Sequence, residues 1–283
     1  MKIKKRKIDL LVLSDIHLGT YGCRAHELLQ YLHTIKPKKV VLNGDIIDAW
    51  QFRKYYFPKS HLKVIRVFLG WLTKGIKIYY VTGNHDEMMR RFKGTKIGSL
   101  NIVNSLVIRK KGKSFWFFHG DVFDVTMKYS KWLAKLGGLG YDLLIIINTF
   151  VNSLYRLMGK GKISLSRKVK ESVKNAVKYI NDYEETAISI AIDKGYDAVV
   201  CGHIHQPAIR TVSNEKGSVE YLNSGDWIEN LTALEYTDGE WTLYKYFEDE
   251  VAQQISKKEL TKSEKKIKQL FEELLQEFPM RVA

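Results

Sequence analysis

The chain has 283 residues, enough for one large domain or two ordinary ones, and its 45% hydrophobic and 27% charged residues are typical of a globular protein. Its formal net charge of +15 favours polyanionic partners: nucleic acid, an anionic membrane surface or phosphorylated substrates. Only Cys23 and Cys201 are present, which excludes a disulfide-rich scaffold and favours a reducing compartment such as the cytoplasm.

The N-terminal segment is basic and then apolar. Its apolar part, residues 8–13, is shorter than the hydrophobic region of a signal peptide and lacks a small-residue cleavage site. No run in the chain reaches the roughly 18 apolar residues of a membrane-spanning helix. We therefore expect residues 8–13 to form a buried strand, and we expect no transmembrane segment.

Short apolar runs recur along the chain, and each ends in polar residues that can bind metals or carry protons. The runs are rich in Val, Ile, Leu, Tyr and Phe, which predicts strands buried on both faces. They are IDLLVLSD (to Asp15), KKVVLNGD (to Asp45), IKIYYVTGNHD (with Asn84 and His85), SFWFFHGD (with His119) and YDAVVCGHIH (with His203 and His205).

The segments between the first three runs have the apolar spacing of helices. They span residues 25–35 and 61–74, and the second has one apolar stripe, formed by Leu62, Ile65, Phe68, Leu69 and Leu72. Strand–helix–strand order predicts parallel pairing with right-handed crossovers. Because ligands bind at the carboxyl ends of such strands, we expect the polar residues to meet there.

A long segment between His119 and His203 is predicted to be almost wholly helical. It contains an apolar stripe that includes Leu143 and Ile147, followed by a basic stretch that includes Arg167, Lys168 and Lys174. Two interpretations stand side by side. The helices pack on the core with a solvated basic face, or they form a cap whose apolar groove binds acyl chains and whose basic residues bind phosphate.

Another segment, residues 50–57, combines aromatic and basic residues and begins at Trp50. It suits a nucleotide ring or a membrane surface, or it is a loop that packs its aromatic residues on the domain. After His205 the pattern alternates in SVEYLNSGDW, LTALEYT and WTLYKYFE, and the turn signal Asp238-Gly239 predicts an antiparallel hairpin region. We expect a core of residues 1–124 and 196–256, a helical cap of residues 125–195, and a C-terminal amphipathic helix of residues 257–283.

The polar strand ends have the composition of a binuclear metal site for phosphate-ester hydrolysis. Two cations roughly 3.5–4 Å apart generate hydroxide and stabilise the charge on phosphorus, and they require a bridging carboxylate with imidazole and oxygen ligands. Asp15 and His17, like His203 and His205, are two residues apart, so both members of a pair face alike on a strand. Singly, each residue could be a turn or core residue, but five such strand ends in one chain favour a shared site. His26, His33 and His61 lack paired ligands and are interpreted as structural or surface residues.

These motifs resemble the calcineurin-like metallophosphoesterases over roughly residues 8–224, the helical insertion excepted. The matching strings are Asp15-Ile-His17, Gly44-Asp45-Ile-Ile-Asp48, Gly83-Asn84-His85-Asp86, His119-Gly120-Asp121 and Gly202-His203-Ile-His205. The resemblance implies an α/β fold, a four-layer α/β/β/α sandwich. It also implies one metal site of Asp15, His17, Asp45 and His205, and a second of Asp45, Asn84, His119 and His203. His85 would be a catalytic residue near the leaving group, oriented by Asp48.

Within that family, the chain is most similar to the UDP-2,3-diacylglucosamine diphosphatases of lipid A synthesis. The shared features are the DIHLG opening, the GDIIDAW and HGDVFD segments, and a helical insertion before GHIHQP. This resemblance implies hydrolysis of a lipid-linked nucleotide sugar to UMP and an acylated sugar 1-phosphate, peripherally at the cytoplasmic face of the inner membrane. One position departs from the pattern, because those enzymes commonly carry Arg where this chain has His85.

Three hypotheses follow. The first is a diphosphatase with two divalent ions, Mn²⁺ ahead of Fe or Zn²⁺. The second is a phosphodiesterase or nuclease on another substrate, for which the net charge of +15 would serve nucleic-acid binding. The third is an inactive scaffold, which we disfavour because no ligand of the motif set is missing.

Overall fold

The protein is described by a computed structural model that covers residues 4–48, 57–123 and 166–255, with the side chains of residues 166–177 excepted. The chain divides into two compact units. The larger consists of residues 1–120 and 188–283, and the smaller consists of residues 121–187. The cap of residues 125–195 stays a prediction. Leu143, Ile147, Trp50 and the expected C-terminal helix lie outside the described residues.

A seven-stranded sheet forms the first layer of strands in the larger unit. The strand order is β14-β13-β2-β4-β5-β7-β6. Four neighbouring strands are parallel and the other three are antiparallel to their neighbours. The parallel strands are β2 (Leu10–Leu13), β4 (Lys39–Asn43), β5 (Lys77–Val81) and β7 (Leu100–Val103); the others are β6 (Lys96–Ile97), β13 (Thr232–Thr237) and β14 (Glu240–Lys245).

A five-stranded sheet forms the second layer, in the order β11-β12-β10-β9-β8. Its three central strands are parallel, and the two edge strands are antiparallel to them. The central strands are β9 (Lys113–Phe118), β10 (Ala198–Cys201) and β12 (Gly217–Asn223), and the edges are β8 (Ser105–Lys110) and β11 (Ala208–Asn214). A small parallel pair, β1 (Arg6–Ile8) with β3 (Ile35–Pro37), completes the strands of the described residues.

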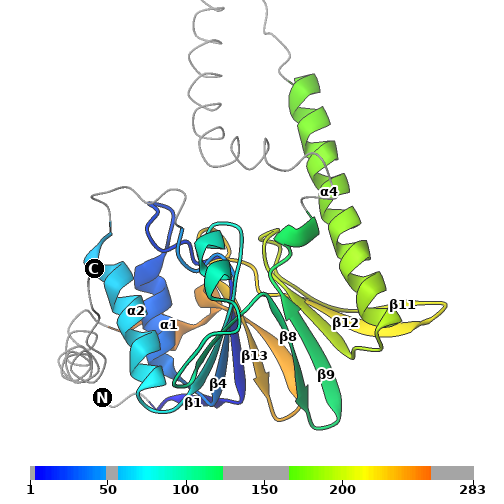
Figure 1. The fold of residues 1–283 in the computed structure, drawn as a ribbon. Helices are drawn as coiled ribbons and strands as arrows, with labels where there is room; N and C mark the ends of the chain where they lie inside the picture. Colours follow the sequence, from blue (N-terminus) through cyan, green and yellow to red (C-terminus); the bar gives the residue numbers. More distant parts are fainter. Residues whose placement is uncertain (1–3, 49–56, 124–165, 256–283) are drawn as a thin grey trace, which may run out of the picture. The chain divides into compact units, whose positions relative to one another are not determined.

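The helices and two apolar cores complete the sandwich. Helices α1 (Ala25–Thr34) and α2 (Lys59–Leu72) lie side by side on the outer face of the seven-stranded sheet (Figure 1). A core that includes Leu28, Val64 and Leu42 fills that interface, and a second core that includes Val41 and Phe117 lies between the two sheets. The α/β fold and the parallel pairing of β2, β4 and β5 are confirmed.

The remaining helical elements are short, apart from α4. They are η1 (Glu87–Phe92), η2 (Asp121–Phe123), η3 (Tyr246–Glu248) and α5 (Glu250–Gln253), whereas α4 spans Ser166–Asp193. The last residues of α4 belong to the larger unit, and Ile192 lies close to Gly217 at the start of β12. Among the described residues, no helix is long and apolar enough to cross a membrane.

Two details of the sequence prediction were wrong. The buried face of α2 is formed by His61, Val64, Val67, Phe68 and Trp71, whereas Leu62 is 45% exposed. The predicted stripe shares Phe68 with this face, and its Ile65 and Leu72 pack against the core as partly buried residues. It did not include His61, whose ring is buried and accepts a hydrogen bond from the Gly19 N–H.

The second error concerns the strands after His205. The expected hairpin at Asp238-Gly239 forms between β13 and β14. The run SVEYLNSGDW supplies β12, which forms an antiparallel pair with β11 as expected. This pair lies in the other sheet, however, where the second neighbour of β12 is the parallel strand β10. Alternating polarity indicates a strand but does not indicate its partner, because a half-exposed face occurs at either sheet.

Candidate metal centre

The loops that follow β2, β4 and β5 are joined by backbone hydrogen bonds. The Asp15 and His17 N–H groups donate to the Gly44 and Asp45 carbonyls at 3.1 and 3.0 Å. Asp86 connects the loop after β5 to the loop after β4, because its buried carboxylate accepts hydrogen bonds from the N–H groups of Ile46 (3.0 Å) and Gly83 (2.6 Å). The three loops at the carboxyl ends of these adjacent parallel strands are therefore hydrogen-bonded to one another, at the edge of the sheet where the strand order predicted the site. We call these three loops the catalytic rim.

The site residues share an uncommon backbone conformation. Asp15, His17, Asp45, His203 and His205 have φ values of 50°, 52°, 54°, 69° and 55°, and only three other non-glycine residues of the described chain have a positive φ. Each such residue costs of order 1–3 kcal/mol, and this strain clusters at functional sites because the surrounding structure must enforce it. Asp15 and His17 do contribute to one cluster, whereas His203 and His205 contribute to two different clusters. The reason given from the sequence was wrong, because all four residues have left-handed backbone conformations beyond the strand ends.

Gly44 and Gly83 are needed because the site leaves no room for a side chain. A Cβ atom on Gly44, whose φ is +86°, would overlap the His119 ring. A Cβ atom on Gly83 would overlap the Asp45 carboxylate. The glycines that precede Asp45 and Asn84 in the motifs thus allow two loops to approach the centre closely.

A first cluster contains Asp15, His17 and His205, which each offer a ligand atom within 4.8 Å of the others. The His205 Nε2 atom lies 3.2 Å from Asp15 Oδ1. The backbone N–H of His203 donates to Asp15 Oδ2 at 3.1 Å, so the loop after β10 is fixed to the loop after β2.

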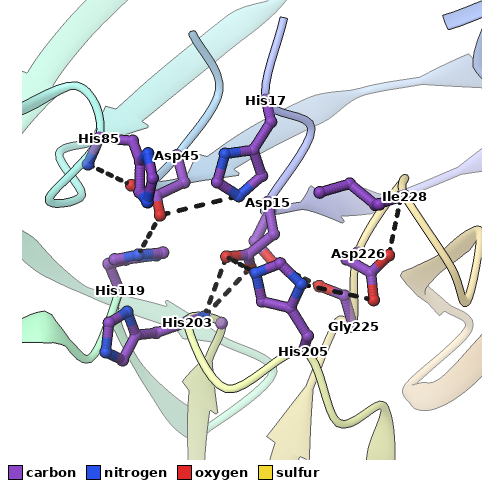
Figure 2. Close-up of polar contacts among 12 residues, drawn as sticks. Asp15, His17, Asp45, His85, His119, His203, His205, Gly225, Asp226 and Ile228 are labelled. Atoms are coloured by element: carbon purple, nitrogen blue, oxygen red, sulfur yellow. Dashed lines mark hydrogen bonds and ion pairs between the residues drawn. The ribbon is translucent and has the colours of Figure 1, made fainter. Parts of the chain in front are cut away.

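A second cluster contains Asp45, His119 and His203 at the same mutual distance. The Nε2 atoms of His119 and His17 lie 3.2 and 3.9 Å from Asp45 Oδ2. Asp45 therefore lies between the two clusters, with His17 on one side and His119 on the other (Figure 2). Six of the seven predicted residues, from the ends of β2, β4, β9 and β10, fall in these two clusters. The seventh, Asn84, follows β5 in the loop whose His85 N–H donates to Asp45 Oδ1 at 2.8 Å.

Outer hydrogen bonds orient the imidazole rings. Asp48 Oδ2 lies 3.1 Å from His17 Nδ1 and 2.8 Å from His85 Nδ1. The His119 Nδ1 atom lies 2.9 Å from the Asn43 carbonyl. An acceptor at Nδ1 places the proton there, so the Nε2 lone pairs of His17 and His119 point to the centre, as in metal-binding histidines. His17, Asp48 and His85 also form a third group of close ligand atoms, which we interpret as this orienting contact.

Sequence reasoning missed Asp226 as part of the site. This fully buried residue follows β12, and its Oδ2 lies 3.8 Å from His205 Nδ1 (Figure 2). Its Oδ1 accepts from the N–H groups of Ile228 (2.7 Å) and Glu229 (2.6 Å). The signal was present, since Asn-Ser-Gly-Asp ends a strand run with Gly-Asp as in the second motif, but the run was assigned to the hairpin region.

Buried carboxylates and histidines set the proton affinities of the centre. Burial alone raises the pKa of Asp15 and Asp45, but contacts with His205 and with His119 outweigh it and hold both below their usual range. Burial lowers the pKa of His205, and the facing Asp15 outweighs this and raises it to about 9. Burial also lowers the pKa of His85, whereas its hydrogen bond to Asp48 raises it, with a net upward shift. Without a bound cation, protonated histidines thus balance the negative charge of the buried carboxylates.

The donor set fits divalent cations. Among the described residues, Asn84 Oδ1 and His17 Nε2 are buried side-chain atoms without a hydrogen-bond partner. A buried polar atom without a partner costs about 1–3 kcal/mol, which a bound cation would recover. Oxygen and imidazole donors next to two carboxylates of low pKa are ligands of divalent metals.

The predicted substrate-binding residues cannot be placed against this centre. Arg167, Lys168 and Lys174 lie in α4, in the part whose side chains are not described, and the predictions for Trp50, Leu143 and Ile147 lie outside the described residues.

Curated relatives of the chain carry one name. A UDP-2,3-diacylglucosamine hydrolase of Aliivibrio fischeri is 24% identical over 244 residues, which cover 84% of this chain and 98% of that protein. The proteins of the same name from Aeromonas salmonicida and Blochmanniella pennsylvanica are 24% and 23% identical and cover 83% and 75% of this chain, and 92% and 85% of their own lengths. A solved archaeal phosphodiesterase aligns with 83% of this chain and 98% of its own, at 13% identity and a TM-score of 0.42, which is too low to support a conclusion.

The family profile is decisive. The profile described as calcineurin-like phosphoesterase matches residues 8–207, which include all seven predicted metal-site residues as well as His85 and Asp48. Members of this family require divalent metal ions, in agreement with the donor set found at the strand ends. The chain therefore belongs to the calcineurin-like phosphoesterase family and is a metal-dependent hydrolase.

Proposed function

We propose that the centre holds two divalent cations and hydrolyses a phosphoric anhydride or diester bond. Asp15, His17, Asp45 and His205 would hold the first cation, and Asp45, Asn84, His119 and His203 the second. The observation that carries the proposal is the position of Asp45 Oδ2 between His17 Nε2 and His119 Nε2. Bound cations would supply a water of lowered pKa and neutralise charge on the phosphoryl oxygens. Mn²⁺ is the proposed metal, and the same donors also suit Fe and Zn²⁺.

His85 is proposed as the residue that donates a hydrogen bond to the leaving group and, where the leaving group is an alkoxide, protonates it. Its ring is only partly buried, with 18% of the side chain exposed, so a substrate can reach it. Asp48 fixes the proton on Nδ1 and stabilises the imidazolium, so Nε2–H can be donated outward. The His85 backbone N–H donates to Asp45 Oδ1 at 2.8 Å, which holds the proton donor next to the proposed bridging carboxylate.

The proposed substrate is UDP-2,3-diacylglucosamine, cleaved to UMP and the acylated sugar 1-phosphate. The support comes from relatives of that name, which align over 85–98% of their own lengths. The place of action that goes with this substrate is the cytoplasmic face of the inner membrane.

Purified protein should be incubated with UDP-2,3-diacylglucosamine and Mn²⁺, and UMP release measured by chromatography. Release of UMP with saturation kinetics supports the proposal. The matched control is Asp45→Asn, which keeps the shape of the side chain but removes the bridging charge. Absence of UMP from a preparation that contains two metals per chain and hydrolyses a generic diester would refute this substrate.

One observation favours a second candidate, a phosphodiesterase whose leaving group is an alcohol. The residue at the proton-donor position is His85, not the Arg common in the lipid A enzymes. A sugar phosphate leaves as a group of pKa near 6 and needs no proton, whereas an alkoxide does. A proton donor at this position is therefore more useful for esters of alcohols, including polynucleotides, than for a diphosphate.

His85→Arg separates the two candidates, because arginine keeps a positive charge but donates no proton at neutral pH. For a diphosphatase we expect UMP release within about tenfold of wild type. For a phosphodiesterase we expect hydrolysis of an alkyl diester to fall by about 10²–10⁴-fold, the usual contribution of a general acid. Single-stranded DNA should be included as a substrate at several salt concentrations, since only a nuclease would cleave it with steep salt dependence.

A further inference from the structure

A surface segment directly after the GNHD motif exposes apolar side chains that no part of the described fold covers. Met88, Phe92 and Ile97 are 59%, 51% and 54% exposed. They are three of the nine large hydrophobic residues exposed in the described chain, and they fall within ten residues. Single exposed hydrophobic residues are normal, but a group in one segment indicates contact with another apolar phase or partner.

The same segment is basic. Arg91, Lys93 and Lys96 are exposed and form no ion pair with the residues that the structure describes. Residues 87–98 contain four cations, including Arg90, against the single carboxylate of Glu87. We call Met88, Phe92, Ile97, Arg91, Lys93 and Lys96 the basic-apolar patch.

The patch belongs to a folded part of the chain. The Gly94 N–H donates to the Ile102 carbonyl at 2.9 Å, and the Thr95 N–H donates to the Phe92 carbonyl at 3.0 Å. Strand β6 (Lys96–Ile97) pairs with β7 at the edge of the seven-stranded sheet. These backbone bonds fix the conformation of the segment, and its apolar side chains are exposed in that conformation.

We propose that the basic-apolar patch docks the protein on an anionic lipid surface. Exposed cations interleaved with Phe, Ile and Met give the two terms that bind a protein to such a surface: attraction to anionic headgroups and burial of apolar side chains at the acyl boundary. A polynucleotide would use the cations but would leave Ile97 and Met88 in water. A second copy of this chain would bring like charges together at Arg91, Lys93 and Lys96.

Docking has a direct consequence for the proposed function, because Met88 follows His85 by only three residues. Contact through the patch would hold the catalytic rim close to the lipid surface, where an acylated substrate resides. The proposal extends the proposed function but is tested without it, since vesicle binding is measured with no substrate and with a metal chelator present.

The full chain should be sedimented with phosphatidylcholine vesicles and with vesicles that also contain phosphatidylglycerol. We expect binding to the anionic vesicles that weakens steeply with salt, as the Debye length falls from ~10 Å at 0.1 M to ~3 Å at 1 M. Each cation near the surface strengthens binding about fivefold, so Arg91→Gln with Lys93→Gln and Lys96→Gln should weaken it on the order of 100-fold. Phe92→Ser with Ile97→Ser should weaken it at least about tenfold.

Matched controls separate the patch from net charge and general apolarity. Lys77→Gln with Arg109→Gln and Lys194→Gln removes the same charge at exposed positions elsewhere. Phe247→Ser with Val251→Ser removes two side chains that are 68% and 55% exposed. Both should bind vesicles like wild type, and all variants should keep the melting temperature and the hydrolysis of a soluble diester.

Three results would overturn the proposal. In the first, the patch variants bind anionic vesicles as tightly as wild type. In the second, the control variants lose as much binding as the patch variants. In the third, the wild-type protein binds vesicles of neither composition. Dimerisation through the patch in analytical ultracentrifugation, or binding of polynucleotide, would then identify the actual partner of the patch.

Discussion

Asp48→Asn tests how far one carboxylate controls the site. Asp48 is 1% exposed and contacts two imidazoles, His17 Nδ1 at 3.1 Å and His85 Nδ1 at 2.8 Å. A hydrogen bond to a charged group contributes about 1.5–3 kcal/mol, and a neutral one about 0.5–1.5 kcal/mol. Asparagine keeps the shape and the acceptor but not the charge, so each contact weakens by about 1–1.5 kcal/mol. The sum, about 2–3 kcal/mol, corresponds to a loss of roughly 30- to 150-fold in kcat/KM.

The pH profile identifies the route of that loss. Asp48 raises the pKa of His85, so the protonated ring persists to higher pH than in a free histidine. Without the carboxylate the pKa of His85 falls, and the alkaline limb of kcat for an alkyl diester should move to lower pH. Bound cations lower the proton affinity of His85 in both proteins, so the direction of the change does not depend on them.

Rates should be measured with an alkyl diester across pH, together with metal content by mass spectrometry. An unshifted alkaline limb with full metal content would refute the proton-donor role of His85. A loss of activity that follows metal loss alone would mean that Asp48 acts only through His17. Asp86→Asn is a comparison variant, since Asp86 is equally buried but contacts no imidazole in the described structure.

Four further predictions concern the metal centre. Gly44→Ala should lower the free energy of unfolding by more than the roughly 1–2 kcal/mol that a left-handed alanine costs, because its Cβ overlaps the His119 ring. Gly75→Ala is the control, since Gly75 has a φ of +73° and no atom lies within 4 Å of the added Cβ. In urea titrations this control should show only the cost of the left-handed backbone. Asp226→Asn should weaken metal affinity about 10–100-fold by releasing the ring of His205, and unchanged affinity in calorimetry would contradict this. The His205 pKa of about 9 means that Mn²⁺ must displace a proton below that pH, so affinity should rise with pH and level off above 9, with proton release seen in calorimetry across buffers. In the metal-free protein the His205 contact with Asp15 contributes stability below pH 6.5, and this contribution is lost as pH rises through about 9.

The residues that cluster at the centre could be predicted because the topology of the sheet determines which strand ends lie together. Buried apolar runs that end in Asp, Asn or His are visible in the sequence, and parallel strands put those ends on one edge of a sheet. The sequence did not point to Asp226, which lies 3.8 Å from His205 in a loop after β12, because the partners of that strand were not apparent from its pattern.

The backbone conformation of the site residues could not be predicted from sequence patterns. Asp15 and His17 were expected to face alike as alternate residues of a strand, yet both have positive φ. Non-glycine residues avoid this region in isolation, so no propensity predicts it. The surrounding hydrogen bonds to Gly44 and Asp45 enforce it, and those bonds exist only in the folded chain.

The proposed metal ligand His17 and the proposed proton donor His85 can share one carboxylate, because the Nε2 atoms of the two rings face different surroundings. Asp48 accepts at Nδ1 of both His17 and His85 and so fixes the same tautomer in each. The Nε2 atom of His17 is buried 3.9 Å from Asp45, where a cation competes with a proton and the neutral ring is the useful form. His85 is instead partly exposed, and in the proposed function a substrate takes the proton from its Nε2 atom. The proposed role of each histidine therefore depends on what its Nε2 atom faces, and Asp48 supports either role.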